Sequence, residues 1–210
     1  MATLLMIPFL LRKGAKINYY DPSGEKKEFS KLKNISFCNN VYDACENTDL
    51  DRVANLILQT HNKGNKIILA GNGGSASIAS HVAIDFTKAA GIKAINFNEA
   101  NLLTCFANDY GYEHWVEKAV EFYGDEGDVF IGISSSGSSE NILNGCHAAR
   151  EKNFSKVITL SGMQAENPLR QLGDINLWAN SMAYNHIENI HQIWLLAVVD
   201  LIIGNAEYSA

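Results

Sequence analysis

The feature that most constrains the fold is a glycine-rich turn, Gly71-Asn72-Gly73-Gly74-Ser75, which stands between two segments of different periodicity. The apolar run 66–70 before it is short and β-branched, as a buried strand is, and residues 75–90 after it are typical of a helix. Such a turn brings backbone N–H groups and a helix N-terminus to bear on an anion. We expect that anion to be a phosphate.

The chain contains the same arrangement a second time. A predicted strand over 128–133 runs into Ser134-Ser135-Ser136-Gly137-Ser138-Ser139, and a predicted helix over 140–152 follows. These six residues carry five hydroxyl groups, which donate hydrogen bonds to phosphoryl oxygens without the help of a lysine. The serine loop is therefore predicted to form the second half of a phosphate site.

From residue 51 onward, short apolar runs alternate with longer amphipathic ones. This alternation predicts a parallel sheet with helices on both faces, in which ligands lie beyond the carboxyl ends of the strands. Both loops follow strands, so we expect them to face one ligand. The predicted strands are 66–70, 94–97, 128–133, 156–160 and 175–179, and the predicted helices are 51–61, 75–90, 99–108, 114–123, 140–152, 168–172 and 184–203.

Several function classes are disfavoured by the same sequence. The chain has no GxxxxGK[ST] motif, which disfavours an NTPase, and Ala76 stands where a dinucleotide-binding turn usually has its third glycine. A nicotinamide enzyme is therefore less favoured than a protein that binds a compact sugar phosphate. The net charge of −6 argues against a broad nucleic-acid surface, so we expect no direct nucleic-acid partner.

The expected location is the cytoplasm, and no membrane partner is expected. The four cysteines form no CxxC pair and no disulfide-dense pattern, so we interpret them as reduced thiols. The most apolar run, 193–203, contains Asp200 and is shorter than the roughly twenty residues that span a bilayer, so it predicts a buried helix. Residues 1–11 are apolar but lack the basic start and the cleavage site of a signal peptide.

Two pairs of acid–base side chains stand at helical spacing. His81 and Asp85 are four residues apart on the helix after the glycine turn, which puts an imidazole and a carboxylate on one face. Glu188 and His191 are three residues apart on the last helix, again on one face. Spacing alone leaves two interpretations open for His81 and Asp85, a solvated surface pair and a catalytic pair.

A set of motifs in a fixed order resembles the phosphoheptose isomerase branch of the sugar isomerase (SIS) domain family. The similarity runs from about residue 51 to the end, which is roughly three-quarters of the chain. The motifs are Gly71–Ser75 followed by His81, Phe106–Gly111, Gly127–Val129, Ile133–Asn141, Lys156–Gly162 and Ile187–His191.

This resemblance implies a flavodoxin-like three-layer α/β sandwich and a homotetramer with sites at subunit interfaces. It also implies conversion of sedoheptulose 7-phosphate to D-glycero-D-manno-heptose 7-phosphate for surface polysaccharide, as lipopolysaccharide or capsule. Asp109 matches a substrate-binding aspartate of the family. The other residues that we expect to bind the substrate are Asn72, Gly73, Ser75, Ser134, Ser135, Ser136 and Ser139.

The resemblance also implies a zinc site, with departures from the family pattern. His81 and Asp85 match a histidine and a glutamate that bind zinc in the family, and Asp85 is one methylene shorter than that glutamate. Glu188 stands where the family has a glutamine ligand, and Leu196 stands where it has an acid–base histidine. We expect any metal to be held by His81, Asp85 and Glu188, with His191 in reserve, and zinc to bind more weakly than in the family.

Two functions follow from this pattern. In the first, the chain isomerises a sugar phosphate through an enediol, with Asp85 as the base and His81, His191 or a metal polarising the oxygens. In the second, the chain binds sugar phosphate without catalysis and acts as a protein partner. The DnaA initiator-associating protein DiaA, an SIS relative, would be its analogue, and a DnaA-type initiator its partner.

Residues 1–50 differ from the rest and are expected to form an N-terminal segment of uncertain role beside an SIS domain over 51–210. A helix is predicted over 4–13, strands over 16–20 and 35–38, and a helix from 41. The segment resembles part of the C-terminal domain of UDP-glucose dehydrogenases without its catalytic segments. The two sequence segments that carry this resemblance are Lys13-Gly14-Ala15-Lys16-Ile17-Asn18-Tyr19-Tyr20-Asp21-Pro22 and Val41-Tyr42-Asp43-Ala44.

Overall fold

The structure, a computed structural model, describes residues 16–21, 29, 31–39 and 41–205. Its contacts divide the chain into two compact units, Met1–Thr48 and Asp49–Ala210. The division falls two residues before the boundary expected from the sequence, because a helix already begins at Asp49. Each unit is described by itself.

The N-terminal unit contains two short parallel strands, β1 (Ile17–Tyr19) and β2 (Ile35–Phe37), and the helix α2 (Val41–Cys45). The Tyr19 ring makes edge contacts with the rings of Phe29 and Phe37, at centroid distances of 5.2 and 5.9 Å. The predicted helix over 4–13 lies outside the described residues, as do residues 13–15 and 22 of the segments that resemble UDP-glucose dehydrogenases.

The larger unit is built on a five-stranded parallel sheet of order β4-β3-β5-β6-β7. The strands begin and end within one or two residues of the positions expected from the sequence. The fold class, a three-layer α/β sandwich with a parallel sheet, is confirmed. The strands are β3 (Ile67–Gly71), β4 (Ala94–Asn96), β5 (Val129–Ser134), β6 (Lys156–Ser161) and β7 (Ile175–Trp178).

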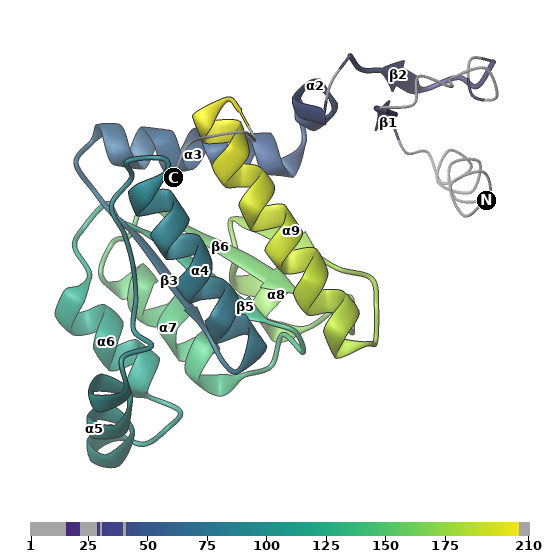
Figure 1. The fold of residues 1–210 in the computed structure, drawn as a ribbon. Coiled ribbons are helices and arrows are strands. Elements are labelled where there is room, and N and C mark those ends of the chain that lie inside the picture. The colour runs from purple at the N-terminus through teal and green to yellow at the C-terminus, as the bar shows by residue number, and fades with distance from the viewer. Residues whose placement is uncertain (1–15, 22–28, 30, 40, 206–210) are drawn as a thin grey trace. The chain divides into compact units, whose positions relative to one another are not determined.

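Helices cover both faces of this sheet (Figure 1). One face carries α3 (Asp49–Asn62), α4 (Gly74–Lys88) and α9 (Tyr184–Ile203), with α4 and α9 packed side by side. The other face carries α6 (Trp115–Tyr123), α7 (Glu140–Glu151) and α8 (Pro168–Leu172). Helix α5 (Ala100–Tyr110) packs on α6 and has no buried residue of its own.

The strand sequences explain why both faces are covered. In β3, Ile67 and Leu69 belong to the core under α3, α4 and α9, whereas Ile68 and Ala70 belong to the core under α6 and α7. Successive side chains of a strand point to opposite faces, so an apolar residue at every position requires a helical layer on each side. The continuous apolar runs of β3 and β5 are therefore central strands of the sheet.

The strand order places the two predicted loops next to each other. From β3 the chain goes to β4 on one side, and it then returns to place β5 on the other side of β3. The crevice between β3 and β5 is the switch point of the sheet, where ligands of such folds bind. The glycine turn follows β3 and the serine loop follows β5, so both open onto this crevice.

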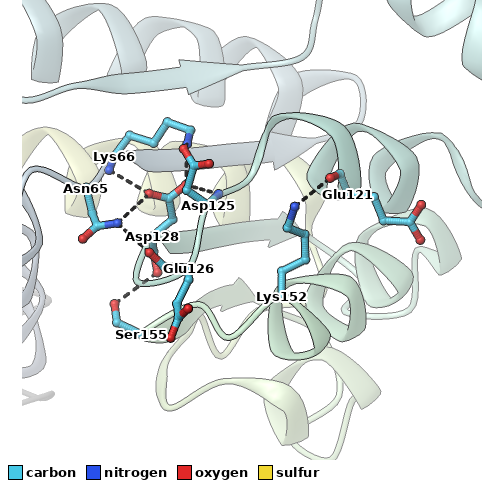
Figure 2. A network of polar contacts seen from close by, with 8 residues as sticks. All are labelled: Asn65, Lys66, Glu121, Asp125, Glu126, Asp128, Lys152 and Ser155. Atoms are coloured by element: carbon cyan, nitrogen blue, oxygen red, sulfur yellow. Dashed lines mark hydrogen bonds and ion pairs between the residues drawn. The ribbon is translucent and has the colours of Figure 1, made fainter.

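At the opposite, amino-terminal edge of the same strands, a buried carboxylate has a complete set of partners (Figure 2). Asp128 accepts hydrogen bonds from the backbone N–H groups of Lys66 (3.0 Å) and Asp125 (2.9 Å) and from Asn65 Nδ2 (3.3 Å). It also forms an ion pair with Lys66 Nζ at 2.6 Å. Burial lowers the pKa of Lys66, but its bonds to Asp125 and Asp128 more than offset this, and the net pKa is raised.

Candidate active site

The glycine turn after β3 is shaped by close backbone approach. A Cβ added to Gly71 would lie 2.6 Å from the backbone carbon and oxygen of Ser75, so a side chain at this position would force the turn open. Gly73, the residue before α4, has a φ of 54°, a conformation that glycine adopts without strain. The turn therefore delivers Ser75, which is buried, directly into the first turn of α4.

The serine loop after β5 is held by its own hydroxyl groups. Ser134 Oγ and Ser139 Oγ share a hydrogen bond of 2.9 Å, and the backbone N–H of Gly137 donates to Ser134 Oγ at 3.2 Å. Gly137 has a φ of 68°, and Asn167 occupies the space that a side chain there would need. The loop is thus a folded turn whose hydroxyls already lie together before any ligand binds.

The two loops meet around a small pocket of about 130 Å³. Six of the residues that the sequence predicts to bind the substrate line this pocket, and Gly73 stands beside it as the residue before α4. Within the described part of the chain, the buried Ser135 Oγ has no hydrogen-bond partner, so one donor is left for a ligand. The lining residues are Asn72, Ser75, Ile133, Ser134, Ser135, Ser136, Ser139, Tyr184 and Glu188.

A reciprocal amide pair that the sequence did not indicate joins the two loops. Asn72 Nδ2 donates to Asn141 Oδ1 at 2.9 Å, and Asn141 Nδ2 donates to Asn72 Oδ1 at 2.8 Å. Tyr112 adds a third bond, from its hydroxyl to Asn72 Oδ1 at 3.2 Å. Asn141 is buried in the first turn of α7, so it fixes the glycine turn against the helix that follows the serine loop.

The first turns of α9 close the pocket with Tyr184 and Glu188, of which Tyr184 was not expected. A Cβ added to Gly74 would lie 2.4–2.6 Å from the Glu188 carboxyl atoms, so this carboxylate rests against the start of α4. Glu188 is the one charged side chain among the described lining residues. The pocket consequently combines neutral donors with one carboxylate.

His81 and Asp85 lie farther along α4, outside the pocket lining. His81 Nε2 is 3.3 Å from Asp85 Oδ2, and His81 Nδ1 is 3.3 Å from Gln192 Nε2 of α9. An amide nitrogen only donates, so with this amide orientation Nδ1 accepts and Nε2–H points to the Asp85 carboxylate. Burial, and then the charge of Asp85, raise the pKa of Asp200 on α9, which places a second carboxyl group near Asp85.

His191 is placed in the core rather than in the pocket lining. Its Nε2–H donates to the backbone oxygen of Ser161 at 3.0 Å, and burial lowers the pKa of its imidazole to about 4 although that bond opposes the shift. His191 is therefore a neutral, packed side chain at physiological pH. Its predicted acid–base and reserve-ligand roles stay untested, and this burial argues against them.

Two other family positions also lie apart from the pocket. Asp109 is exposed on α5, where it accepts a hydrogen bond from the side chain of Asn108 at 2.9 Å. Leu196 packs against the core under α3, α4 and α9, so the position of the family's acid–base histidine is an apolar contact in this chain. Neither residue lines the pocket.

The predicted zinc ligands are not assembled by the fold of one chain. His81 and Asp85 are adjacent, but Glu188 lines the pocket at the start of α4. Among residues 16–21, 29, 31–39 and 41–205, no three His, Cys, Asp or Glu side chains are grouped so that they could hold a metal ion. The residues of the single chain do not fit a zinc ion, and no chemical step is assigned to one.

Comparison with known proteins agrees with this geometry. The sequence model of the family described as SIS domain matches residues 34–162. The phosphoheptose isomerase of Fusobacterium nucleatum subsp. nucleatum is 30% identical over 183 residues, which cover 85% of this chain and 91% of the relative. The phosphoheptose isomerase of Enterobacter sp. (strain 638) is 36% identical over 148 residues, covering 68% and 76%.

Among solved structures, phosphoheptose isomerase GmhA from Neisseria gonorrhoeae superposes with a TM-score of 0.70 at 33% sequence identity. The superposition covers 74% of this chain and 85% of that protein. The similarity therefore extends over most of both molecules, and residues 34–162, which match the family model, include the two loops.

Proposed function

The chain belongs to the SIS domain family, and on that premise we propose that it is a phosphoheptose isomerase. The reaction is the conversion of sedoheptulose 7-phosphate to D-glycero-D-manno-heptose 7-phosphate through an enediol. The observation that carries the proposal is the pocket between the glycine turn and the serine loop, at the switch point of a parallel sheet. The relatives are named as isomerases, so an initiator-binding role like that of DiaA is not favoured.

The phosphate of the substrate is proposed to bind between Gly73–Ser75 and Ser134–Ser139. The pocket offers hydroxyl and amide donors beside the N-terminus of α4, and helix N-termini favour anions. Ser135 supplies a buried hydroxyl that has no other partner among the described residues. These neutral donors orient a phosphoryl group without a lysine.

The carbon chain of the sugar is proposed to run along α4 toward His81 and Asp85. Six residues separate Ser75 from His81, a rise of about 9 Å along a helix, which is comparable to an extended seven-carbon sugar phosphate. Asp85 would take the proton from the carbon next to the carbonyl and return it to the former carbonyl carbon, while the hydroxyl proton passes from the terminal oxygen to the former carbonyl oxygen, which gives the aldose. His81, oriented by Gln192, would donate its Nε2–H to the Asp85 carboxylate and so hold that carboxylate in position.

Four further features belong to the proposal. These are a homotetramer with sites at subunit interfaces, location in the cytoplasm, a role in making heptose for lipopolysaccharide or capsule, and activity that does not depend on added zinc. Exposed apolar side chains on α4 and α9, among them Ile84 and Ile193, support self-association. Helix α9 is apolar and long enough to cross a membrane by length and composition alone, but its inner face packs in the core of the larger unit. Light scattering at micromolar concentration tests the tetramer, and a monomer would refute it.

The test of the function is an assay of the purified full chain with sedoheptulose 7-phosphate, with and without added zinc, and with product analysis. We expect the heptose aldose to form, and Asp85→Asn to lower kcat at least about 100-fold, as the loss of a general base does. Glu166→Gln, a change of charge at an exposed site outside the pocket lining, is the control. Full activity of Asp85→Asn after chelation would show that neither the carboxylate nor a metal carries the reaction.

A further inference from the structure

We propose that Glu188 is a resident anion of the phosphate pocket, which the phosphoryl group of the substrate must displace in order to bind. This inference rests on the proposed phosphate site and assigns Glu188 a role in selecting the ligand, with no metal involved. It follows from where the side chain lies, from the charges around it and from the donors that surround it.

The position of Glu188 is set by the absence of a side chain at Gly74. The carboxyl carbon and both carboxyl oxygens lie within 2.6 Å of the place where a Cβ of residue 74 would stand. Any other residue at the first position of α4 would force the carboxylate to move from this place. Glycine at this position therefore gives an anion access to the start of α4, and in this structure that anion belongs to the chain itself.

The charges around the pocket leave this carboxylate without compensation. The described lining residues include no Lys, Arg or His, and Glu188 is the single ionisable acid among them. A favourable influence comes from the N-terminus of α4, which attracts a carboxylate and a phosphate alike. The two anions therefore compete for the same partial positive charge.

Both groups would have to share one small pocket. Its volume is about 130 Å³, and Ser134, Ser135, Ser136 and Ser139 line it together with Glu188. A dianionic phosphate bound to these hydroxyls would stand close to the carboxylate, where like charges repel in a partly buried site. The side chain must swing away from Gly74, or the affinity for phosphate must fall.

This competition gives the pocket a selectivity that its hydroxyl groups alone would not give. Inorganic phosphate has no other contact with which to offset the displacement of Glu188, so it binds weakly. A sugar phosphate offsets the displacement through its hydroxyls and carbon chain, so it binds more tightly. The carboxylate thereby disfavours free phosphate as an inhibitor of the site.

The experiment is calorimetric titration of the full chain with inorganic phosphate at low ionic strength. Glu188→Gln keeps the shape of the side chain and removes its charge, and we expect it to lower the Kd for phosphate at least about tenfold. Glu151→Gln, at the exposed end of α7, makes the same change of charge outside the pocket and should leave the Kd within about twofold of wild type. The difference between wild type and Glu188→Gln should shrink at high salt, because screening weakens the repulsion.

The outcomes separate this inference from the proposed function. An equal Kd for wild type and Glu188→Gln would overturn the resident anion and leave the phosphate pocket standing. Failure of both proteins to bind either phosphate or sugar phosphate would overturn the pocket and the inference with it. Glu188→Ala, which also removes the carboxylate, should tighten phosphate binding as well, and it replaces the glutamine variant if that protein does not fold.

Discussion

Two carboxylates at opposite edges of one sheet have contrasting surroundings. Asp128, at the amino-terminal edge, is buried. It accepts hydrogen bonds from two backbone N–H groups and from the side chain of Asn65, and it forms an ion pair with Lys66. Glu188, at the carboxyl-terminal edge, rests against Gly74 in a pocket whose described lining residues include no cation. Both edges belong to the same strands, so the difference lies in the loops and helices that each edge carries.

The contrast separates a group that stabilises the fold from one that regulates a site. A buried carboxylate with all its partners contributes to folding and has no capacity left for a ligand. Among the described residues, Glu188 has no cation beside it in the pocket lining, and one of the neighbouring hydroxyls, that of Ser135, has no hydrogen-bond partner. An incoming anion can therefore gain hydrogen bonds there. The amino-terminal edge is therefore predicted to control stability and the carboxyl-terminal edge to control binding.

The largest effect is expected at the amino-terminal edge. Asp128→Asn removes a charge that is paired with Lys66 and should lower the free energy of unfolding by about 3–5 kcal/mol, the usual cost of breaking a buried ion pair. The folded variant should bind phosphate as wild type does. Urea denaturation measures the loss, and Asp125→Asn, whose side chain is 78% exposed, should cost much less, because exposed ion pairs contribute little to stability. Similar losses of unfolding free energy in Asp128→Asn and Asp125→Asn would contradict the structural role given to the buried carboxylate.

The next effect depends on pH and concerns His191. Burial lowers the pKa of this imidazole to about 4 in the folded chain, from about 6.5 when unfolded, so the unfolded chain binds the extra proton first. Its contribution to stability is complete above about pH 6.5 and is lost as the pH falls toward 4, by about 3 kcal/mol in all. We expect the free energy of unfolding of His191→Gln, measured by urea titration at several pH values, to fall less steeply between pH 6.5 and 4 than that of wild type. The exposed His147→Gln should not, and an unchanged pH profile in His191→Gln would refute the assignment.

A smaller effect is expected in the serine loop. Ser136→Ala combined with Ser139→Ala removes two donors of about 1 kcal/mol each, so the Kd for sugar phosphate should rise about 30-fold. The free energy of unfolding should fall by only about 1–2 kcal/mol, because the lost hydroxyl bonds lie within the loop itself. Calorimetry compares this variant with Ser155→Ala at the amino-terminal edge, where Ser155 bonds the backbone oxygen of Asp128. An unchanged Kd for sugar phosphate in the double variant would show that this loop does not bind the phosphate.

The smallest effect is expected for the amide pair between the loops. Asn141→Ala leaves Asn72 with only the Tyr112 hydroxyl as a side-chain partner among the described residues, so KM should rise about fivefold, a cost of about 1 kcal/mol. The value of kcat should stay within about twofold, because Asn72 lies at the phosphate end of the proposed site. Asn144→Ala is the matched control, because Asn144 lies on the same helix as Asn141 and its side chain donates to the backbone oxygen of Glu113, outside the pocket. A fall in kcat with unchanged KM would show that Asn141 acts at the reacting carbons instead.

The sequence was sufficient for the sheet and for the meeting of the two loops. Apolar residues at every position of β3 and β5 require helices on both faces, and the carboxyl ends of neighbouring parallel strands share one edge. The lining of the pocket by Asn72, Ser75 and the serines follows from these two facts. Element ends differ from expectation by one or two residues, since terminal turns depend on local contacts.

The rotation of α9 was not predictable from its sequence. Positions 188, 191 and 192 are all candidates for facing α4, because they lie within about one turn of each other and apolar residues occupy much of the circumference of the helix. The structure brings Gln192 to His81, Glu188 to Gly74 and His191 into the core. The expected group of His81, Asp85 and Glu188 is therefore spread over neighbouring turns. The pairing of Asn72 with Asn141 is likewise a contact between residues far apart in the chain, and amide residues carry no periodic signal.

The central claim is that the carboxyl-terminal edge of the sheet isomerises a sugar phosphate through an enediol. Its most direct test is turnover of sedoheptulose 7-phosphate by the full chain in heavy water, followed by NMR of the product. The account predicts deuterium on the carbon next to the aldehyde, and loss of both product and label in Asp85→Asn. A wild-type chain that binds the sugar phosphate but forms no aldose and exchanges no hydrogen would contradict it.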